Sequence, residues 1–291
     1  MMRATRRLFV VAIVLTLGGS LEGRQLPLSP DQDAVRFIAI GDMGTGKKPQ
    51  FELAAAMETA RKTFPFEFAI MLGDNIYDGD TAADFRDKFE LPYQALLGGG
   101  VKFYAALGNH DGRNQSRYAP FNMGGEPYYT FRKGNVEFFA LDSNYMSPKQ
   151  LAWLEKKLEN SDAEWKIPYF HHPFYSSATF HGSAVELRLV IEPLFVKYGV
   201  QVVFAGHEHV YERVKPQKGI TYFVEGASGQ LRKGNLTKGS SLTASGFDTD
   251  LSFIQVAVAG DLLSYQTISR TGATVDSGTI ARVPSTATAT Q

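Results

Sequence analysis

The amino-acid sequence predicts an α/β fold built in layers, and two observations carry this prediction. Between about residues 35 and 206, short apolar runs of strand type alternate with longer stretches of helix type, which is typical of layered α/β folds. After residue 218 the stretches are strand-like only, with Gly and Asp between them. That change favours either a second sheet or an antiparallel edge on the first. We expect one domain over residues 33–283, with no linker inside it.

The strands expected in the first part of the chain are continuous apolar runs, the pattern of strands buried on both faces. They cover residues 35–40, 66–72, 101–107, 165–170 and 200–206. Residues 128–143 are expected to form a hairpin that turns at Gly134 and Asn135. The later strands are expected at residues 219–228, 253–260, 262–269 and 273–280.

Four helices are expected between the earlier strands, at residues 50–63, 81–97, 147–160 and 183–198. The third has the clearest start, because Ser147 can cap its first turn and Pro148 follows at a position that needs no N–H donor. Pro92 is expected to break the second helix.

Composition excludes several classes of function. The 291 residues include no Cys, so disulfides, thiolate catalysis and thiolate zinc sites are excluded. Thirty basic and thirty acidic residues give a formal net charge of zero. The chain therefore shows no sign of a surface that binds nucleic acid through bulk charge. The composition predicts no particular oligomeric state.

Both ends of the chain are predicted to lie outside the fold. Residues 1–23 have the layout of a signal peptide, because three arginines precede an apolar run over residues 8–17 and small residues follow. The run is short for a membrane span, so we expect a secreted or periplasmic protein without a stable span after cleavage. An uncleaved N-terminal anchor is the alternative. Residues 284–291 are small, polar and rich in Thr, and are expected to be a disordered tail.

Metal-capable side chains recur at one kind of place, just after an apolar strand and a glycine or turn. The motifs GDMG, GDNIY, GNHD, HHP and GHEH supply Asp42, Asp74, Tyr77, Asn109, His110, His171, His172, His207 and His209. Five of the six histidines lie in these motifs, and the sixth is His181. Ligands of open α/β sheets bind beyond the carboxyl ends of the strands, so these side chains are expected to converge on one crevice.

The donor atoms of this set indicate which metals fit. Carboxylate, amide, imidazole and phenol groups without sulfur suit iron, manganese or zinc. Two Asp, one Asn, one Tyr and three of the His make seven donors, which are too many for one catalytic ion with open positions but fit two ions that share a bridging carboxylate. Two-metal sites hold their ions about 3.5–4 Å apart and clamp an in-line displacement at phosphorus.

The series of motifs resembles the calcineurin-like metallophosphoesterases over about residues 35–225, and within them the small, single-domain purple acid phosphatases. Most members of the superfamily carry a histidine two residues after the first aspartate, where this chain has Gly44. Purple acid phosphatases lack that histidine and use a tyrosine three residues after the second aspartate, where this chain has Tyr77. The stretch at residues 127–143 is also similar to the small branch. The resemblance implies a layered β-sandwich flanked by helices, with a dinuclear metal site at the carboxyl ends of the strands.

The resemblance also implies a role for each residue. The Fe(III) ligands would be Asp42, Asp74, Tyr77 and His209, and Asp74 would bridge to a divalent Fe, Zn or Mn ion held by Asn109, His171 and His207. His171 is preferred to His172 because the family ligand lies two residues before the proline. His110 and His181 resemble the family's histidines that contact phosphate and assist proton transfer.

The implied function is an exported acid phosphatase that cleaves small phosphomonoesters with a metal-activated hydroxide. The residues themselves agree, because a phenol with a pKa near 10 needs a strong Lewis acid to bind as phenolate, as Fe(III) is. A phosphodiesterase or nucleotide hydrolase on the same fold is an alternative. A metal-bearing redox or binding protein is a further one.

Three other features have two interpretations each. Asp111 either orients His110 or belongs to a turn. Arg213 either contacts substrate or pairs with Glu212, and the structural interpretation is favoured. The glycine-rich stretch at residues 225–234 is a candidate border of the cleft.

Overall fold

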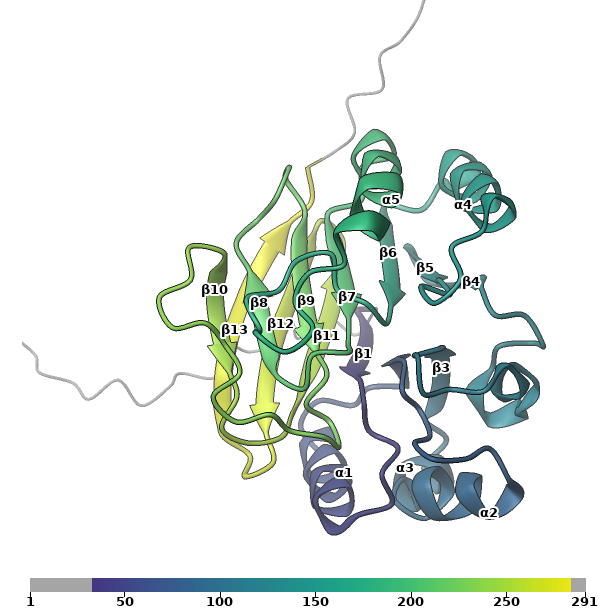
Figure 1. Ribbon diagram of the computed structural model, residues 1–291, viewed down its shortest axis with the longest axis vertical. Helices are drawn as coiled ribbons and strands as arrows, with labels where there is room; N and C mark the ends of the chain where they lie inside the picture. Colours follow the sequence, from purple (N-terminus) through teal and green to yellow (C-terminus); the bar gives the residue numbers. More distant parts are fainter. Residues whose placement is uncertain (1–32, 284–291) are drawn as a thin grey trace, which may run out of the picture.

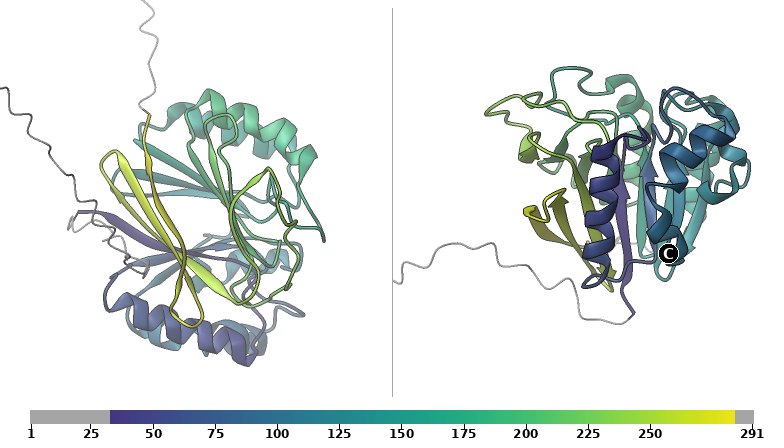
Figure 2. Two further views of the ribbon diagram at one scale, coloured as in Figure 1. Left: turned by 90° about the vertical axis from the view of Figure 1, so that its left-hand side faces the viewer. Right: turned by 90° about the horizontal axis from the view of Figure 1, so that it is seen from below.

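Two β-sheets pack face to face in the structure, a computed structural model that describes residues 33–283. Helices cover the outer side of each sheet, as Figures 1 and 2 show. The predicted β-sandwich flanked by helices is therefore confirmed. The predicted signal peptide and the predicted tail lie outside the described residues.

The first sheet joins a parallel half to an antiparallel half. Its strands, in spatial order, are β13 (Thr274–Ala281), β12 (Leu262–Ser269), β11 (Ser252–Ala259), β1 (Val35–Ile40), β2 (Phe68–Leu72) and β3 (Lys102–Ala106). The pairs β1–β2 and β2–β3 are parallel, whereas β11 pairs with β1 and β12 in the antiparallel sense. The strands predicted at residues 253–260, 262–269 and 273–280 thus supply an antiparallel extension of the first sheet.

The second sheet has the same mixed character. Its strands, in spatial order, are β10 (Thr243–Phe247), β8 (Tyr211–Val214), β9 (Thr221–Glu225), β7 (Val202–Ala205), β6 (Trp165–Phe170), β5 (Val136–Ala140) and β4 (Tyr129–Lys133). The strands β5, β6, β7 and β9 run parallel to one another. The sequence did not predict β8 or β10, and both lie at the antiparallel edge of this sheet.

The helices lie close to the predicted positions. They are α1 (Lys48–Arg61), α2 (Ala82–Phe85), α3 (Gln94–Gly98), α4 (Pro148–Asn160) and α5 (Val185–Lys197), with a π-helical turn η1 (Arg86–Glu90) and 3-10 turns η2 (Arg113–Arg117) and η3 (Ala119–Phe121). The predicted helix at 81–97 is thus divided into α2, η1 and α3. The Ser147 hydroxyl caps α4 by accepting from the Gln150 N–H, as predicted.

Aromatic side chains fill the space between the two sheets. The ring of Phe37 on β1 stacks on Phe68 of β2, with 5.4 Å between centroids. From the other sheet, Phe138 and Phe204 meet Phe37 edge-on at 5.1 and 5.9 Å. All four are buried, so the sheets are held together by apolar burial of about 1.5–3 kcal/mol for each such side chain.

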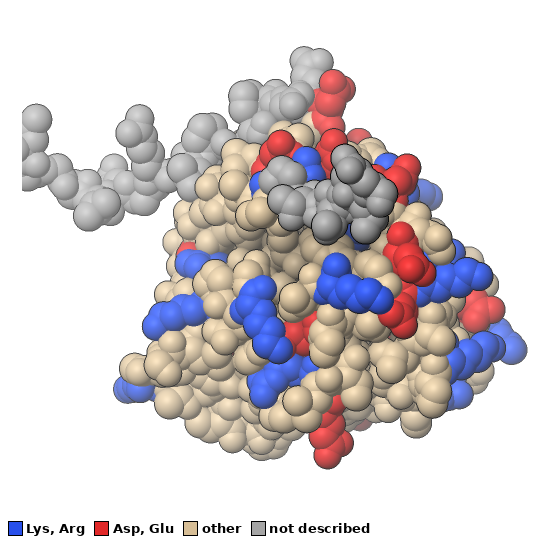
Figure 3. All heavy atoms as spheres, turned by 90° about the horizontal axis from the view of Figure 1, so that it is seen from above, with Lys and Arg blue, Asp and Glu red and all other residues tan. Residues whose placement is uncertain are grey.

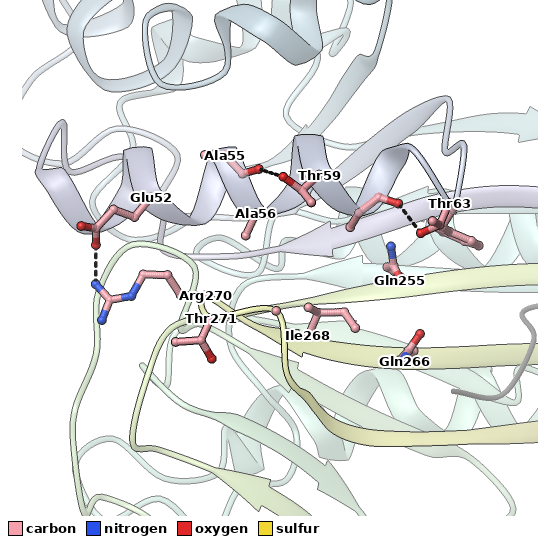
Figure 4. Close-up of a pocket in the computed structure, with 13 residues that line it drawn as sticks. Glu52, Ala55, Ala56, Thr59, Thr63, Gln255, Gln266, Ile268, Arg270 and Thr271 are labelled. Atoms are coloured by element: carbon pink, nitrogen blue, oxygen red, sulfur yellow. Dashed lines mark hydrogen bonds and ion pairs between the residues drawn. The ribbon is translucent and has the colours of Figure 1, made fainter. Parts of the chain in front are cut away.

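Charged side chains of both signs and a long groove mark the outer surface. Lys, Arg, Asp and Glu are interspersed over the face shown in Figure 3. A groove of about 770 Å³ lies between α1 and the strands β11 and β12, with Ala56 and Thr59 opposite Ile268 (Figure 4). None of the predicted site residues lines this groove. Within residues 33–283, no helix is both long enough and apolar enough to cross a membrane.

Candidate metal centre

Five parallel strands from the two sheets deliver polar side chains at their carboxyl ends. In the first sheet, β1, β2 and β3 end shortly before Asp42, Asp74 and Asn109. In the second sheet, β6 and β7 end shortly before His171 and His207. The two sets meet, because the His171 ring contacts both the Leu72 carbonyl and the Asn109 side chain.

The backbone at these strand ends is bent into an unusual conformation. Asp42, Asp74 and His207 have φ values of 56°, 51° and 72°, in the left-handed region that side chains other than glycine rarely occupy. Gly73 precedes Asp74 with φ 90°, and a Cβ there would lie 2.5 Å from the His171 Nδ1. Gly73 is thus needed for close approach as well as for the turn, and a Cβ on Gly108 or Gly206 would likewise lie within 2.8 Å of neighbouring atoms. Such strain concentrates at functional sites.

The first group of donors consists of Asp42, Asp74, Tyr77 and His209. The Tyr77 hydroxyl lies 3.1 Å from the Asp42 Oδ1 and 3.3 Å from the His209 Nε2. The His209 Nε2 is also 3.3 Å from the Asp42 Oδ1, and Asp42, Asp74 and His209 each place a ligand atom within 4.8 Å of the others. Asp42 and Asp74 are buried, so neither carboxylate is solvated by bulk water.

The second group consists of His171, His207 and Asn109, with His172 beside them. The His171 Nε2 lies 3.0 Å from the His207 Nδ1 and 2.9 Å from the Asn109 Oδ1. It also lies 3.5 Å from the Asp74 Oδ1, so Asp74 stands between the two groups. His172 has a ring nitrogen within 4.8 Å of the donors of His171 and His207, and its Nδ1 is 2.9 Å from the Ser143 hydroxyl.

The electrostatics of these donors are unfavourable without a cation. Burial, and then repulsion from Asp74, raises the pKa of Asp42 well above its usual value. Burial, followed by the Asp42 charge, also raises the pKa of Tyr77. Burial lowers the pKa of His171 well below its usual value, and burial with the Arg232 charge lowers the pKa of His209 to about 4. A bound cation would stabilise the deprotonated forms of these groups, namely the carboxylates, the neutral imidazoles and the phenolate.

The two groups therefore pass a chemical test for metal binding. Their oxygen and ring nitrogen atoms lie 2.9–3.5 Å from one another, and neither group contains a Lys or Arg that could balance the carboxylates. Buried charges in proteins are normally paired or bound to metals. The absence of sulfur and the mixture of imidazole and carboxylate suit iron, zinc or manganese.

His110 and His181 lie at the opening of this centre. The His110 N–H donates to the Asp74 Oδ1 at 2.9 Å, and its exposed ring lies 4.9 Å from the Tyr77 ring. The His181 ring stacks on His207 with 4.0 Å between centroids and remains partly exposed. Both rings thus contact donors of the centre and remain accessible to a ligand.

Two carboxylates, those of Asp111 and Glu208, hold the loops that carry these histidines. The Asp111 Oδ2 accepts from the N–H groups of Asn75 and Gly108, and its Oδ1 from Ile76, so Asp111 orders the loop and does not bond the His110 ring. This favours the turn interpretation of Asp111. Burial and the Asp74 charge raise its pKa to about 7.

Glu208 plays the corresponding part on the other side, and the sequence did not predict it. Its buried carboxylate accepts from the N–H of His181 at 2.9 Å, from the N–H of Gly182, and from the Asn235 Nδ2 at 3.1 Å. Glu208 thereby fastens the loop of His181 to the loop of Asn235. The only local signal was an acidic residue between two candidate ligands.

Arg213 does not pair with Glu212. Its Nε donates to the Asp276 Oδ2 at 2.7 Å, and the Tyr211 hydroxyl donates to the same atom at 2.6 Å. The structural interpretation is right, but the partner comes from β13. Glu212 instead accepts from the Ser176 hydroxyl and the Ser177 N–H.

The class of protein follows from comparison with known families. The model of the calcineurin-like phosphoesterases matches residues 35–211, which is more than half of the chain. The chain therefore belongs to the calcineurin-like phosphoesterases, and its two mixed sheets carry the candidate centre at the carboxyl ends of their parallel strands.

Particular relatives agree with the resemblance to purple acid phosphatases. The chain is 28% identical over 236 residues to tartrate-resistant acid phosphatase type 5 of Mus musculus, covering 66% of this chain and 72% of the relative. It is 24% identical over 261 residues to purple acid phosphatase 4 of Arabidopsis thaliana, covering 76% and 77%. A purple acid phosphatase from yellow lupin seeds has the same fold, with a TM-score of 0.71 over 86% of this chain and 54% of that chain at 18% identity.

Proposed function

We propose that the chain is an exported acid phosphatase that hydrolyses small phosphomonoesters at a pair of metal ions. The observation that carries the proposal is the position of Asp74 between two groups of buried donors, 3.5 Å from the His171 Nε2. Membership of the phosphoesterase family and the names of the relatives support the reaction. Export rests on the signal-peptide pattern of residues 1–23 alone.

Each group of donors would hold one ion. Asp42, Asp74, Tyr77 and His209 would hold Fe(III), because a buried phenol whose pKa is raised needs a strong Lewis acid to bind as phenolate. Asn109, His171 and His207 would hold a divalent Fe, Zn or Mn ion, with Asp74 shared between the two. When bound, such ions polarise a phosphoryl oxygen and lower the pKa of a coordinated water far below its bulk value.

The chain's own groups then orient the ester and move protons. The exposed His110 ring is placed to donate a proton to the leaving oxygen, because its backbone is tied to Asp74 and its ring is free. The His181 ring, stacked on His207, is placed to donate a hydrogen bond to a phosphoryl oxygen. Gly73 and Gly108 allow the strands to approach closely enough for these contacts.

Replacement of the shared carboxylate tests the proposal. Asp74→Asn should lose metal from both groups and lower kcat/KM on para-nitrophenyl phosphate by more than about a thousandfold, since the metals supply most of the electrostatic stabilisation. Metal per chain is measured by elemental analysis, and a visible absorption band tests for tyrosinate bound to Fe(III). The matched control is Glu192→Gln. Glu192 is a buried carboxylate on α5 that accepts hydrogen bonds from the hydroxyls of Tyr175 and Tyr222.

Two results would contradict the proposal. One is an Asp74→Asn protein that keeps its metal content and activity. The other is a wild-type protein loaded with two metals that hydrolyses bis-para-nitrophenyl phosphate faster than the monoester, which would indicate a phosphodiesterase.

A further inference from the structure

Several arginines in the described residues form ion pairs with carboxylates, and Arg232 is among those that do not. Ion pairs join Arg132 to Asp162, Arg213 to Asp276, Arg270 to Glu52 and Asp250, and Arg282 to Asp261. Within residues 33–283, Arg232 has no carboxylate within ion-pair distance, and its buried Nε has no hydrogen-bond partner. A guanidinium held in this way lacks its usual counter-ion.

The Arg232 guanidinium lies over an aromatic ring beside the candidate centre. Its Cζ is 3.3 Å from the ring centroid of Phe180, and that ring meets His181 edge-on at 4.4 Å. His181 in turn stacks on His207 at 4.0 Å. A cation on an aromatic face is fixed in position but keeps its N–H donors at the edge of the guanidinium plane.

The backbone also ties Arg232 to the centre. The Arg232 N–H donates to the His209 carbonyl at 3.0 Å. The segment that follows pairs with the loop of His181, because Thr179 N–H donates to the Asn235 carbonyl at 2.9 Å and Ala178 forms a bridge with Leu236. Glu208 bonds to both loops, so Phe180, His181 and Arg232 form one ordered rim, here called the Arg232 rim.

A second arginine at the opening provides a contrast. Arg113 lies over the Tyr145 ring at 4.4 Å, and Tyr145 lines a cavity of about 370 Å³ with Asn109 and His172. Arg113 is exposed, however, and its charge acts on Asp142, whose pKa burial raises. Arg232 has no such carboxylate nearby among the described residues. Besides burial, its charge instead contributes to the lowered pKa of His181 and of His209.

We propose that the Arg232 rim binds a second anionic group of the substrate, so that the enzyme prefers phosphate esters and anhydrides whose leaving group carries a further negative charge. This rests on the proposed phosphatase function for its substrate class. A substrate oxyanion would accept from the terminal N–H groups of the Arg232 guanidinium. This contact would leave the metal pair to bind the phosphoryl group that is transferred.

Two esters of nearly equal size test the proposal on the metal-loaded protein. 2-Phosphoglycerate carries a carboxylate where glycerol 2-phosphate carries a hydroxymethyl group. Arg232→Gln should lower kcat/KM for 2-phosphoglycerate by about tenfold, the worth of one charge-assisted contact, mainly through KM. The value for glycerol 2-phosphate should change by less than about twofold, since its leaving group is uncharged. Arg113→Gln is the control, because it removes a positive charge from an arginine that lies over the Tyr145 ring. It should leave the ratio of the kcat/KM values for the two esters unchanged.

Equilibrium binding gives a readout that does not depend on turnover. Measured by calorimetry, Arg232→Gln should weaken the binding of pyrophosphate by about tenfold and the binding of inorganic phosphate by less than about threefold. Arg232→Lys keeps the charge but loses the flat guanidinium, and should give an intermediate value. This conservative variant also serves if the glutamine variant does not fold.

Three outcomes would overturn the proposal: equal losses for both esters in Arg232→Gln, no loss for either, or a changed ratio in Arg113→Gln instead. If the wild-type protein hydrolyses neither ester, the proposed function fails, and the binding of pyrophosphate against phosphate still decides the role of Arg232.

Discussion

Two polar regions of this molecule are built on opposite rules. In the first region, the Asp276 carboxylate on β13 accepts hydrogen bonds from the Arg213 guanidinium and the Tyr211 hydroxyl, both on β8. In the candidate centre, the buried carboxylates of Asp42 and Asp74 lie 3.3 and 3.5 Å from the ring nitrogens of His209 and His171, with no Lys or Arg of the described residues paired to them. The structural network pairs its carboxylate with a protein cation, whereas the candidate centre gathers carboxylates and imidazoles that a metal cation would have to neutralise. The comparison separates the two without reference to any relative.

The largest effect expected from this contrast is the response to metal removal. A tightly bound ion stabilises only the folded state, by about 4 kcal/mol at a thousandfold excess over Kd. Chelation should therefore lower Tm by about 10 °C for a chain of this size. Differential scanning calorimetry with and without chelator measures the shift. An unchanged Tm in protein shown to have lost its metal would place the centre with the structural networks.

An Asp→Asn substitution should change the free energy of unfolding of the metal-free protein in opposite directions in the two regions. Asp276→Asn leaves the Arg213 charge partly buried without its partner, and should destabilise by about 2–3 kcal/mol. Asp42→Asn removes a buried charge that repels Asp74, and should stabilise by about 1 kcal/mol. Urea unfolding in the presence of chelator measures both. Loss of stability in both variants would show that Asp42 already has adequate partners.

Glu225 sharpens the comparison because it is buried near the centre yet has hydrogen-bond donors. Burial raises its pKa from 4.5 to about 8, although the Ser252 hydroxyl and the Ala227 N–H oppose this. The folded state thus holds the proton more tightly than the unfolded chain. The stability contribution is full below pH 4.5 and is lost as the pH rises through about 8.

Metal-free wild type should therefore lose more stability between pH 5 and pH 9 than Glu225→Gln does, as measured by urea unfolding at each pH. Parallel pH profiles of the two proteins would contradict the shifted pKa.

The smallest expected effect concerns Glu208, whose carboxylate has hydrogen-bond donors as Asp276 does but holds loops beside the candidate centre. Glu208→Gln should keep both metals but loosen the N–H contacts to His181 and Gly182, lowering kcat by about tenfold, in the usual range for a mispositioned catalytic group. Elemental analysis and steady-state kinetics check the two parts. Loss of metal together with activity would assign Glu208 to the support of His207 and His209.

Local patterns predicted the elements that bring the donors together. The strand expected at residues 35–40 is β1, and the capped helix at 147–160 is α4, because apolar runs and cap residues act within a few residues of themselves. The strand β10 was missed because it contains a glycine and alternates between partial and full exposure, so nothing in it resembles a buried strand. The strand β8 was overlooked because its residues follow the GHEH motif directly.

The candidate centre was predictable for the same reason, and its surroundings were not. Strand ends in a layered fold share an edge, so a donor after each strand predicts a meeting point. The partner of Arg213 lies 63 residues away, and the contact between Arg232 and Phe180 joins two loops. Such pairings depend on how loops cross in space, which no local pattern records.

Both groups of donors draw on both sheets. Asp42, Asp74 and Asn109 follow strands of the first sheet, while His171 and His207 follow strands of the second. A cation in either group would cross-link the two sheets, and it could bind fully only after the sheets have packed against each other. Metal uptake should then report late folding, and the two halves of the chain, expressed apart, should each bind metal poorly.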